Sequence, residues 1–144
     1  MPKIAIQGGL GSFHEIAAQA YFGDDLELLC CETFQDVFSA LHDQATNKVM
    51  VAIGNSRYGD INKVYDVLIA NHVKKEALRY WISGEVYVPV TQCLLALPGT
   101  TLSDIQEVHS QAPALGQCTT FLHTKLPHAV LVEEEDTAGS AALV

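Results

Sequence analysis

The sequence has few positively charged side chains. Its 144 residues include 17 Asp and Glu against 8 Lys and Arg, which gives a formal net charge of −9. A protein with this charge repels the phosphate backbone of nucleic acids, so we expect no nucleic acid partner. Arg57 and Arg79 are the only arginines. An anionic ligand would therefore be held mainly by backbone N–H groups, hydroxyls and amides.

Long apolar runs are also lacking. Residues 93–97 form one of the longest, far short of the ~20 residues that a membrane-spanning helix needs. Residues 1–3 lead directly into an expected strand and not into a signal-peptide core. We therefore expect a cytoplasmic protein with no membrane partner. The hydrophobic content of 49% agrees with a globular chain that buries a core.

Neither the cysteines nor the histidines are spaced for a metal site. No C-x-x-C pair occurs, and no two histidines lie four residues apart on an expected helix. We expect no bound metal. Because cytosolic proteins keep thiols reduced, the cysteines are expected to be reduced, buried and structural. They are Cys30, Cys31, Cys93 and Cys118.

The stretch 49–59 combines an expected strand with a polar turn. Residues 49–53 are apolar and rich in β-branched side chains, which predicts a short strand buried on both faces. Asn55 and Ser56 open a polar turn, and a helical pattern begins at Asp60. A strand, a turn and a helix N-terminus together are a common anion site. A plain polar turn with a helix cap is the alternative.

A glycine-rich loop follows the first expected strand, residues 3–7. Its residues 8–11 are Gly-Gly-Leu-Gly, and Ser12 can cap the next helix. They do not match G-x-G-x-x-G, and no G-K-S/T follows, so a dinucleotide site or a P-loop is disfavoured. The glycines serve either a tight turn or a ligand-facing loop.

Strands and helices are expected to alternate along the first half of the chain. Strands at 3–7, 26–31 and 49–53, each followed by a helical pattern, predict a parallel sheet with right-handed crossovers. Thr33 and Asp36 predict a capping box at the second helix.

The chain is expected to cross into a second lobe near residue 81. A β pattern over 85–97 predicts a long strand, interrupted at Pro89, and Trp81 is expected to cover the edge of the core. Lys74, Lys75 and Arg79 are expected to form a solvated face. Later elements are a helical turn near 101–107, strands at 108–110 and 128–132, a helix beginning at Pro113, and a final helix capped by Asp136 or Thr137.

Several segments, in order, carry a family resemblance. Residues 8–14 are similar to a glycine-rich G-x-x-G-S/T-F/Y loop, and residues 54–59 to an E-N-S-x-x-G loop. Residues 110–118 are similar to S-H-P-Q-A-L-x-Q-C, and residues 136–141 to S-T-A-x-A-A. Shorter matches lie at 34–38, 84–85 and 93–95. Together they resemble the catalytic region of prephenate dehydratase, which makes phenylpyruvate for phenylalanine biosynthesis.

This resemblance implies an α/β fold with two lobes and mainly parallel sheets, like the type II periplasmic binding proteins. Residues 1–80 would form the first lobe, with the glycine-rich and Asn-Ser loops. Residues 81–144 would form the second lobe, incomplete at its C-terminal end. The resemblance further implies an active site in the cleft between the lobes, prephenate as the small-molecule substrate, no cofactor and a homo-oligomer.

The resemblance also implies roles for particular residues. Asn55, Ser56 and Gln117 would be catalytic, and the substrate would be bound by Gly11, Ser12, Phe13, Ser110 and Thr137. Three alternatives stay open. Gln117 can be a solvent-facing helix residue, Thr137 only a helix cap, and Arg57, at a variable family position, only a solvated charge.

The chain departs from the family pattern at several positions. Gly54 stands where the family has Glu, Gln92 where it has His, Asp136 where it has Ser, and residues 110–113 read Ser-Gln-Ala-Pro in place of S-H-P-Q. The T-R-F/D motif that carries the family's catalytic threonine is absent. We therefore expect impaired turnover by this chain alone. A small-anion binding module without turnover, or an arogenate dehydratase, are the alternative functions.

Overall fold

A computed structural model describes residues 1–73 and 80–144. The chain divides into two compact units, Met1–Pro89 and Val90–Val144. The predicted solvated face of Lys74, Lys75 and Arg79 lies outside the described residues. Within the described ranges, no helix is both long and apolar enough to span a membrane. The predicted lobe boundary between residues 80 and 81 precedes the division at Pro89 and stays a prediction.

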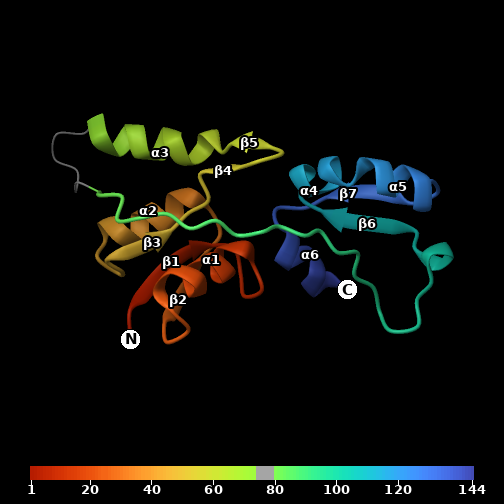
Figure 1. Cartoon of the computed structure of the whole chain (residues 1–144), viewed down its shortest axis with the longest axis horizontal. Coiled ribbons are helices and arrows are strands. Elements are labelled where there is room, and N and C mark those ends of the chain that lie inside the picture. The colour runs from red at the N-terminus through yellow and green to blue at the C-terminus, as the bar shows by residue number, and fades with distance from the viewer. Residues whose placement is uncertain (74–79) are drawn as a thin grey trace. The chain divides into compact units, whose positions relative to one another are not determined.

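The first unit is built on a three-stranded parallel sheet (Figure 1). Strand β1 lies in the centre and pairs in parallel with β2 on one side and β3 on the other, as the alternating pattern predicted. The strands are β1 (Lys3–Gln7), β2 (Glu27–Cys31) and β3 (Lys48–Met50), and the connecting helices are α1 (Phe13–Phe22) and α2 (Phe34–His42).

Both connecting helices begin at the predicted caps. The Ser12 hydroxyl accepts a hydrogen bond from the Glu15 N–H at 3.3 Å. Thr33 and Asp36 form the predicted capping box, in which the Thr33 hydroxyl accepts from the Asp36 N–H and the Asp36 carboxylate accepts from the Thr33 N–H. Two otherwise unpaired N–H groups are thereby satisfied at the start of α2.

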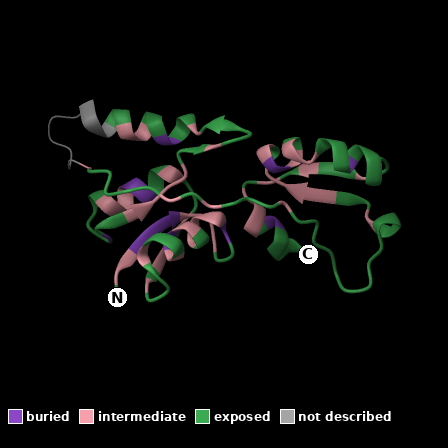
Figure 2. Cartoon of the chain, in the orientation of Figure 1, coloured by how far each residue is buried: buried purple, intermediate pink, exposed green. Residues whose placement is uncertain are grey.

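The core of the first unit lies around the central strand (Figure 2). Ile4, Ala5 and Ile6 are fully buried because both neighbours of β1 are strands and helices cover the sheet. Ala18 of α1 and Phe38 of α2 bury their side chains as well.

The predicted strand over 49–53 is shorter and less buried than expected. β3 covers Lys48–Met50, its residues Val49 and Met50 are only partly buried, and Ile53 is 48% exposed. The sheet order explains this correction, because within the described residues β3 is an edge strand whose one neighbour is β1. An apolar sequence run alone does not distinguish an edge strand from a central one.

Thr46 fastens the start of β3 to the start of β1. Its hydroxyl is 2.6 Å from the Lys3 carbonyl and 3.2 Å from the Lys48 N–H, and the residue is 7% exposed. We expect Thr46→Val to lower the free energy of unfolding by about 1–3 kcal/mol, because it leaves buried backbone groups without a partner. Urea unfolding measures this, with Thr46→Ser, which keeps the hydroxyl, as the control. Equal stability of both variants would contradict it.

A small hairpin separates the sheet from the next helix. β4 (Gly54–Asn55) and β5 (Gly59–Asp60) pair antiparallel, and α3 (Asn62–Val73) follows. The Ile61 N–H closes the base of the hairpin by donating to the Ile53 carbonyl at 3.0 Å. Val64 of α3 is fully buried.

Residues 80–98 do not form the predicted strand. They are assigned no regular secondary structure, Leu95 is 62% exposed, and Trp81, expected at the core edge, is 82% exposed. A strand needs a neighbour for its N–H and C=O groups, and none pairs with this segment in the described part of the chain. Its first residues belong to the first unit and contact the helices α1 and α2, where the Tyr21 hydroxyl donates to the Ser83 carbonyl and the Tyr80 ring lies 5.6 Å from the Phe38 ring.

The second unit contains a pair of parallel strands, β6 and β7, with helices α4 and α5 packed over them and α6 at their end (Figure 1). Ala114, Leu122 and Leu126 are its buried apolar residues. Its elements are a 3₁₀ turn at Leu102–Asp104, β6 (Glu107–Ser110), α4 (Ala112–Gln117), α5 (Thr119–Lys125), β7 (Val130–Glu133) and α6 (Thr137–Leu143).

The cysteines are free, but the prediction that they are buried is wrong. Cys30 and Cys93 are exposed, and Cys31 and Cys118 are partly buried. Cys30 lies on β2, an edge strand, and Cys93 lies in the segment without regular structure, so neither has the cover that a central strand would receive.

Candidate functional site

The two candidate segments of the first unit leave its sheet from the same edge. The glycine-rich loop follows β1, and the Asn55 turn follows the adjacent strand β3. Because the two strands are parallel, both segments leave from the carboxyl edge. Ligands of open parallel α/β sheets bind outside this edge. The sheet topology therefore groups two segments that are about 40 residues apart in the sequence.

Asn55 organises its own turn. Its Oδ1 atom accepts hydrogen bonds from the backbone N–H groups of Arg57, at 2.9 Å, and Tyr58, at 3.2 Å. This is an Asx turn, in which a short polar side chain imitates a backbone carbonyl. The side-chain oxygen is thus committed to the turn. The amide N–H₂ is the part of Asn55 that can donate to a carboxylate or a hydroxyl.

Ser56 and Arg57 lie exposed in the turn. The predicted arrangement of a strand, a turn and a helix N-terminus needs a correction here, because β5 lies between the turn and α3, which begins at Asn62 rather than at Asp60. The first N–H groups of α3 therefore do not follow Ser56 directly. A two-residue strand is too short to show a periodic sequence signal, which is why the pattern missed the hairpin.

The glycine-rich loop is held by its own helix. Gly11 has a φ of 84°, a conformation that favours glycine, and its N–H donates to the Glu15 carboxylate. Ser12 is 8% exposed and is used as the N-cap, while Phe13 is partly buried. A carboxylate of the protein thus already occupies the N-terminus of α1, where an anion is favoured.

The candidate residues of the second unit also follow strand ends. Ser110 is the last residue of β6, and Thr137 is the first residue of α6, shortly after β7. The Glu134 N–H donates to the Ser110 carbonyl at 3.0 Å, so the chain segments that leave the two strands stay paired. Gln117 is the last residue of α4 and is partly buried. Cys118 is the C-cap of that helix, and its N–H donates to the Ala114 carbonyl at 3.2 Å.

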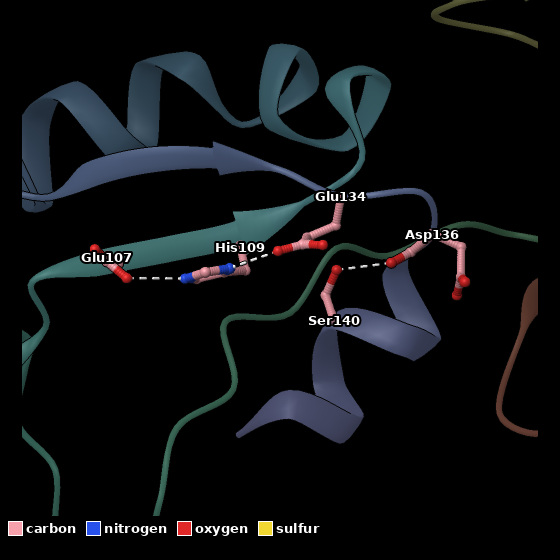
Figure 3. A network of polar contacts seen from close by, with 5 residues as sticks. All are labelled: Glu107, His109, Glu134, Asp136 and Ser140. Atoms are coloured by element: carbon pink, nitrogen blue, oxygen red, sulfur yellow. Dashed lines mark hydrogen bonds and ion pairs between the residues drawn. The ribbon is translucent and has the colours of Figure 1, made fainter.

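Asp136, not Thr137, is the N-cap of α6. Its Oδ1 atom accepts from the Gly139 N–H at 2.7 Å. Its backbone carbonyl accepts from the Ser140 hydroxyl at 2.7 Å (Figure 3). The alternative that Thr137 serves only as the cap is therefore excluded. Aspartate is a strong capping residue, so the departure from the family's Ser at this position preserves the helix start.

A histidine between two carboxylates was missed by the sequence analysis. His109 Nδ1 lies 2.8 Å from Glu134 Oε1, and Nε2 lies 3.1 Å from Glu107 Oε2 (Figure 3). Hydrogen bonds to Glu134 and Glu107 raise the pKa of His109. Glu107 sits two residues away on β6, but Glu134 is 25 residues away, so only the Glu107 neighbour was visible in the sequence.

This arrangement gives a pH prediction. Because the folded-state pKa of His109 is raised, its contribution to stability is complete below the unfolded pKa, about 6.5, and is lost as the pH rises through the folded pKa. We expect the melting temperature of His109→Gln to fall less than that of the wild type as the pH rises from 6 to 9. Thermal unfolding by circular dichroism measures this. His128→Gln, at an exposed position in the same unit, should keep the wild-type profile.

The remaining reactive side chains do not assemble a metal centre or a nucleophile. Among the described residues, no three His, Cys, Asp or Glu side chains gather in a way that could hold a metal ion. Burial raises the pKa of the Cys31 thiol, with Asp36 adding to the effect, and burial likewise raises that of Cys30. Both thiols are therefore less ionised at neutral pH than an ordinary cysteine.

Comparison with known proteins matches residues 4–144 to the family described as prephenate dehydratase. Arogenate dehydratase/prephenate dehydratase 2, chloroplastic, of Arabidopsis thaliana is 36% identical over 141 residues, which are 96% of this chain and 34% of that protein. The prephenate dehydratase of Arthrobacter aurescens in complex with L-Phe superposes with a TM-score of 0.81 at 29% identity, over 97% of this chain and 44% of that one.

A third match carries a different description. A structure titled GqqA, a novel type of quorum quenching acylases, has a TM-score of 0.78 at 31% identity and covers 99% of this chain and 48% of that one. The chain spans about a third of the length of the curated relatives it matches. The structural matches confirm the predicted fold class, an α/β fold with mainly parallel sheets of the type II periplasmic-binding-protein kind.

Proposed function

Because the chain belongs to the prephenate dehydratase family, we propose that it serves the conversion of prephenate to phenylpyruvate in L-phenylalanine biosynthesis. The match over residues 4–144 is the observation that carries this proposal. The candidate residues support it, because in each unit they lie in segments that leave the carboxyl ends of paired parallel strands.

The proposed reaction makes limited demands on a protein. The bond between the ring and its carboxylate breaks and releases carbon dioxide, the electron pair enters the ring, and the ring hydroxyl leaves and takes up a proton to become water. Aromatisation supplies much of the driving force. The protein has to bind a dianion and to hydrogen bond or protonate the departing hydroxyl, which is work typically worth ~10²–10⁴-fold in rate. No step of this reaction requires a redox cofactor.

We assign the substrate contacts of the first unit chiefly to Asn55 and Ser56. The Asn55 side chain keeps its N–H₂ group for the ligand while its oxygen orders the turn, and the exposed Ser56 hydroxyl lies next to it in the chain. Ser12 and Phe13 would contact the substrate from the neighbouring loop. The Gly11 N–H could join them only by exchanging the Glu15 carboxylate for one of the substrate.

In the second unit, we assign a polar contact with the reacting ring to Gln117 and further contacts to Ser110 and Thr137. All three are partly buried, so their polar groups are reachable by a small ligand and still shielded from much of the solvent. Because Asp136 caps α6, the Thr137 hydroxyl is not needed for capping and can serve the ligand. Arg57 keeps the role of an exposed charge.

Arogenate, the amino-acid analogue of prephenate, is the closest alternative substrate. The name of the Arabidopsis relative includes both dehydratase activities. Arogenate carries an ammonium group where prephenate carries a keto oxygen, so a site selective for arogenate would offer a hydrogen-bond acceptor or a carboxylate at that position. A small-anion binding module without turnover is the alternative outside enzymes.

The proposal also includes a cytoplasmic location, a homo-oligomer, and no nucleic acid or membrane as a partner. The net charge of −9 supports the exclusion of nucleic acids. Exposed apolar side chains such as Leu94, Leu95 and Leu97 support association between copies, because apolar surface of this kind gains free energy when it is covered. Sedimentation of the purified chain would test the assembly state.

The test is to titrate the 144-residue chain with prephenate and with arogenate in a calorimeter, and then to follow phenylpyruvate and phenylalanine formation. We expect prephenate to bind, and the arogenate titration tells the two substrates apart. Turnover would show that the chain is an enzyme by itself. Binding without turnover would show that the chain binds the substrate but does not catalyse the reaction alone. If neither compound binds and neither reacts, the proposal is wrong.

The acylase match adds one further activity to measure. Its TM-score of 0.78 and identity of 31% are close to the 0.81 and 29% of the Arthrobacter aurescens dehydratase. The fold therefore does not distinguish between the two activities. Hydrolysis of an N-acyl amide needs an activated nucleophile or water, and the raised thiol pKa values of Cys30 and Cys31 do not favour a cysteine in this role. We therefore expect neither of these two thiols to act as an acylase nucleophile, and release of free amine from an N-acyl amide measures whether the chain has that activity.

A further inference from the structure

His14 connects the ends of all three strands of the first sheet. It lies in the first turn of α1, and its Nε2 atom accepts a hydrogen bond from the Ala52 N–H at 3.1 Å, across 38 residues of sequence. Ala52 follows β3 and precedes Asn55 by three positions. The His14 ring also contacts the edge of Phe34, the first residue of α2 after β2, with 5.8 Å between the ring centres.

The other ring nitrogen contacts the central strand. Because Nε2 accepts a bond, the proton of the neutral imidazole lies on Nδ1. The ring makes a hydrogen bond with the backbone of Gln7, the last residue of β1, where the carbonyl is the acceptor available to an N–H. One imidazole thus joins the carboxyl end of β1 to the segment that leaves β3, and so links the glycine-rich loop to the Asn55 turn.

The bond to Ala52 exists in one protonation state. A protonated imidazole carries a proton on each nitrogen, so Nε2 could no longer accept, and the Ala52 N–H would face another N–H. Burial lowers the pKa of His14, and the Gln7 hydrogen bond opposes that effect. The ring is therefore neutral at neutral pH, and acidification removes the contact.

We propose that His14 is a positioning residue, whose neutral imidazole holds the Ala52–Asn55 segment in its binding geometry and whose protonation releases that segment. The inference rests on the proposed function, because the ligand held at Asn55 is taken to be prephenate. His14 acts through Ala52 and the hairpin and does not need to touch the ligand.

The titratable groups on the neighbouring helices and on β2 have other partners. Glu15 on α1 accepts hydrogen bonds from the Gly11 N–H and from the Gln19 side chain. Asp36 on α2 accepts from the Thr33 hydroxyl. The Cys31 thiol at the end of β2 donates to the Leu29 carbonyl. Burial is the largest cause of the shift in the His14 pKa, and no carboxylate contributes to it. Acidification would therefore act on this contact through the ring itself.

The first measurement needs no ligand. In the 144-residue chain, NMR of the His14 imidazole gives its protonation, and hydrogen exchange gives the protection of the Ala52 amide. We expect the Ala52 amide to lose protection by at least about tenfold as His14 becomes protonated, because a hydrogen bond in a partly buried position is lost. In His14→Gln, the Oε1 atom can accept from the Ala52 N–H at any pH because the glutamine side chain does not titrate. The protection of the Ala52 amide should therefore not depend on pH between 5 and 8.

The second measurement is prephenate affinity at the same pH values, with a protein-free blank at each pH because acid speeds aromatisation. We expect wild-type affinity to fall about tenfold or more on acidification. His14→Gln should bind within a few-fold of the wild type at neutral pH and keep that affinity on acidification, and His14→Ala should bind weakly at every pH. His42→Gln, at an exposed position on α2, should keep the wild-type pH profile.

The outcomes separate the two proposals. The role of His14 would be overturned if His14→Gln kept the wild-type pH dependence of prephenate affinity. It would also be overturned if the Ala52 amide stayed protected when His14 is protonated. If Ala52 opens on acidification and prephenate does not bind at any pH, the positioning contact is supported and the proposed ligand is rejected.

Discussion

Replacing Ile6 with alanine is expected to lower the free energy of unfolding of the first unit by about 2–5 kcal/mol. Ile6 is fully buried on the central strand β1 and belongs to a cluster with Ile4 and Ala18, which Leu28 and Met50 cover from the neighbouring strands. Truncation to alanine removes buried methyl and methylene groups and leaves a cavity that two flanking strands cannot fill without breaking their pairing.

Hydrogen exchange of the β1 amides measures this effect in the first unit alone. Ile6→Val removes a single methylene and should cost about 0.5–1.5 kcal/mol, so the three proteins should rank in the order wild type, valine, alanine. Ile69→Ala on α3 is the surface control, because that side chain is 60% exposed. A domain is stable by only about 5–15 kcal/mol, so Ile6→Ala removes a large share of the stability, and the milder Ile6→Val keeps the ranking measurable. A valine variant weaker than the alanine variant would contradict the cavity argument.

Local features of the sequence predicted most of the first unit. The alternation of strands and helices, the Ser12 cap and the Thr33–Asp36 capping box depend on residues within a few positions of one another, and all of them are present. The parallel sheet followed from the same alternation, because right-handed crossovers leave few other topologies.

The errors came from features that depend on distant partners. Val49 and Met50 are partly buried because β3 lies at a sheet edge, and residues 85–97 form no strand because no neighbour pairs with them in the described part of the chain. An apolar alternating pattern shows that a segment can form a strand, but the hydrogen-bonding partner decides whether it does.

The same distinction between local and distant partners explains which residues of the candidate site were predicted and which histidine contacts were missed. Asn55 and Ser56 were found because they follow a strand end and fit a family motif within one short stretch. His14 and His109 were missed as structural links because their partners are 38 and 25 residues away. The available signals were a histidine after a glycine-rich loop and a histidine within a short strand, but neither signal identifies the residue that the imidazole contacts.

Replacing Asn55 is expected to have the largest effect on ligand binding. The Asn55→Ala variant loses the N–H₂ group proposed to donate to a charged carboxylate, and a hydrogen bond to a charged group is worth about 1.5–3 kcal/mol, or roughly 10- to 150-fold in affinity. It also loses the Oδ1 bonds to the Arg57 and Tyr58 N–H groups. Because this turn is exposed, we expect the accompanying loss of stability to be only about 1 kcal/mol.

Asn55→Asp separates the two roles of this side chain. Aspartate keeps an oxygen that can accept from both turn N–H groups, and it replaces the donor with a negative charge that repels a dianion. We therefore expect Asn55→Asp to keep the wild-type melting temperature and to bind prephenate at least as weakly as Asn55→Ala. Ser56→Ala, which removes one exposed hydroxyl, should lose about 2- to 10-fold in affinity. Calorimetric titration and thermal unfolding of the same samples measure both quantities. Wild-type binding by Asn55→Asp would show that Asn55 only orders its turn, because the oxygen it retains serves the turn and cannot donate to the ligand.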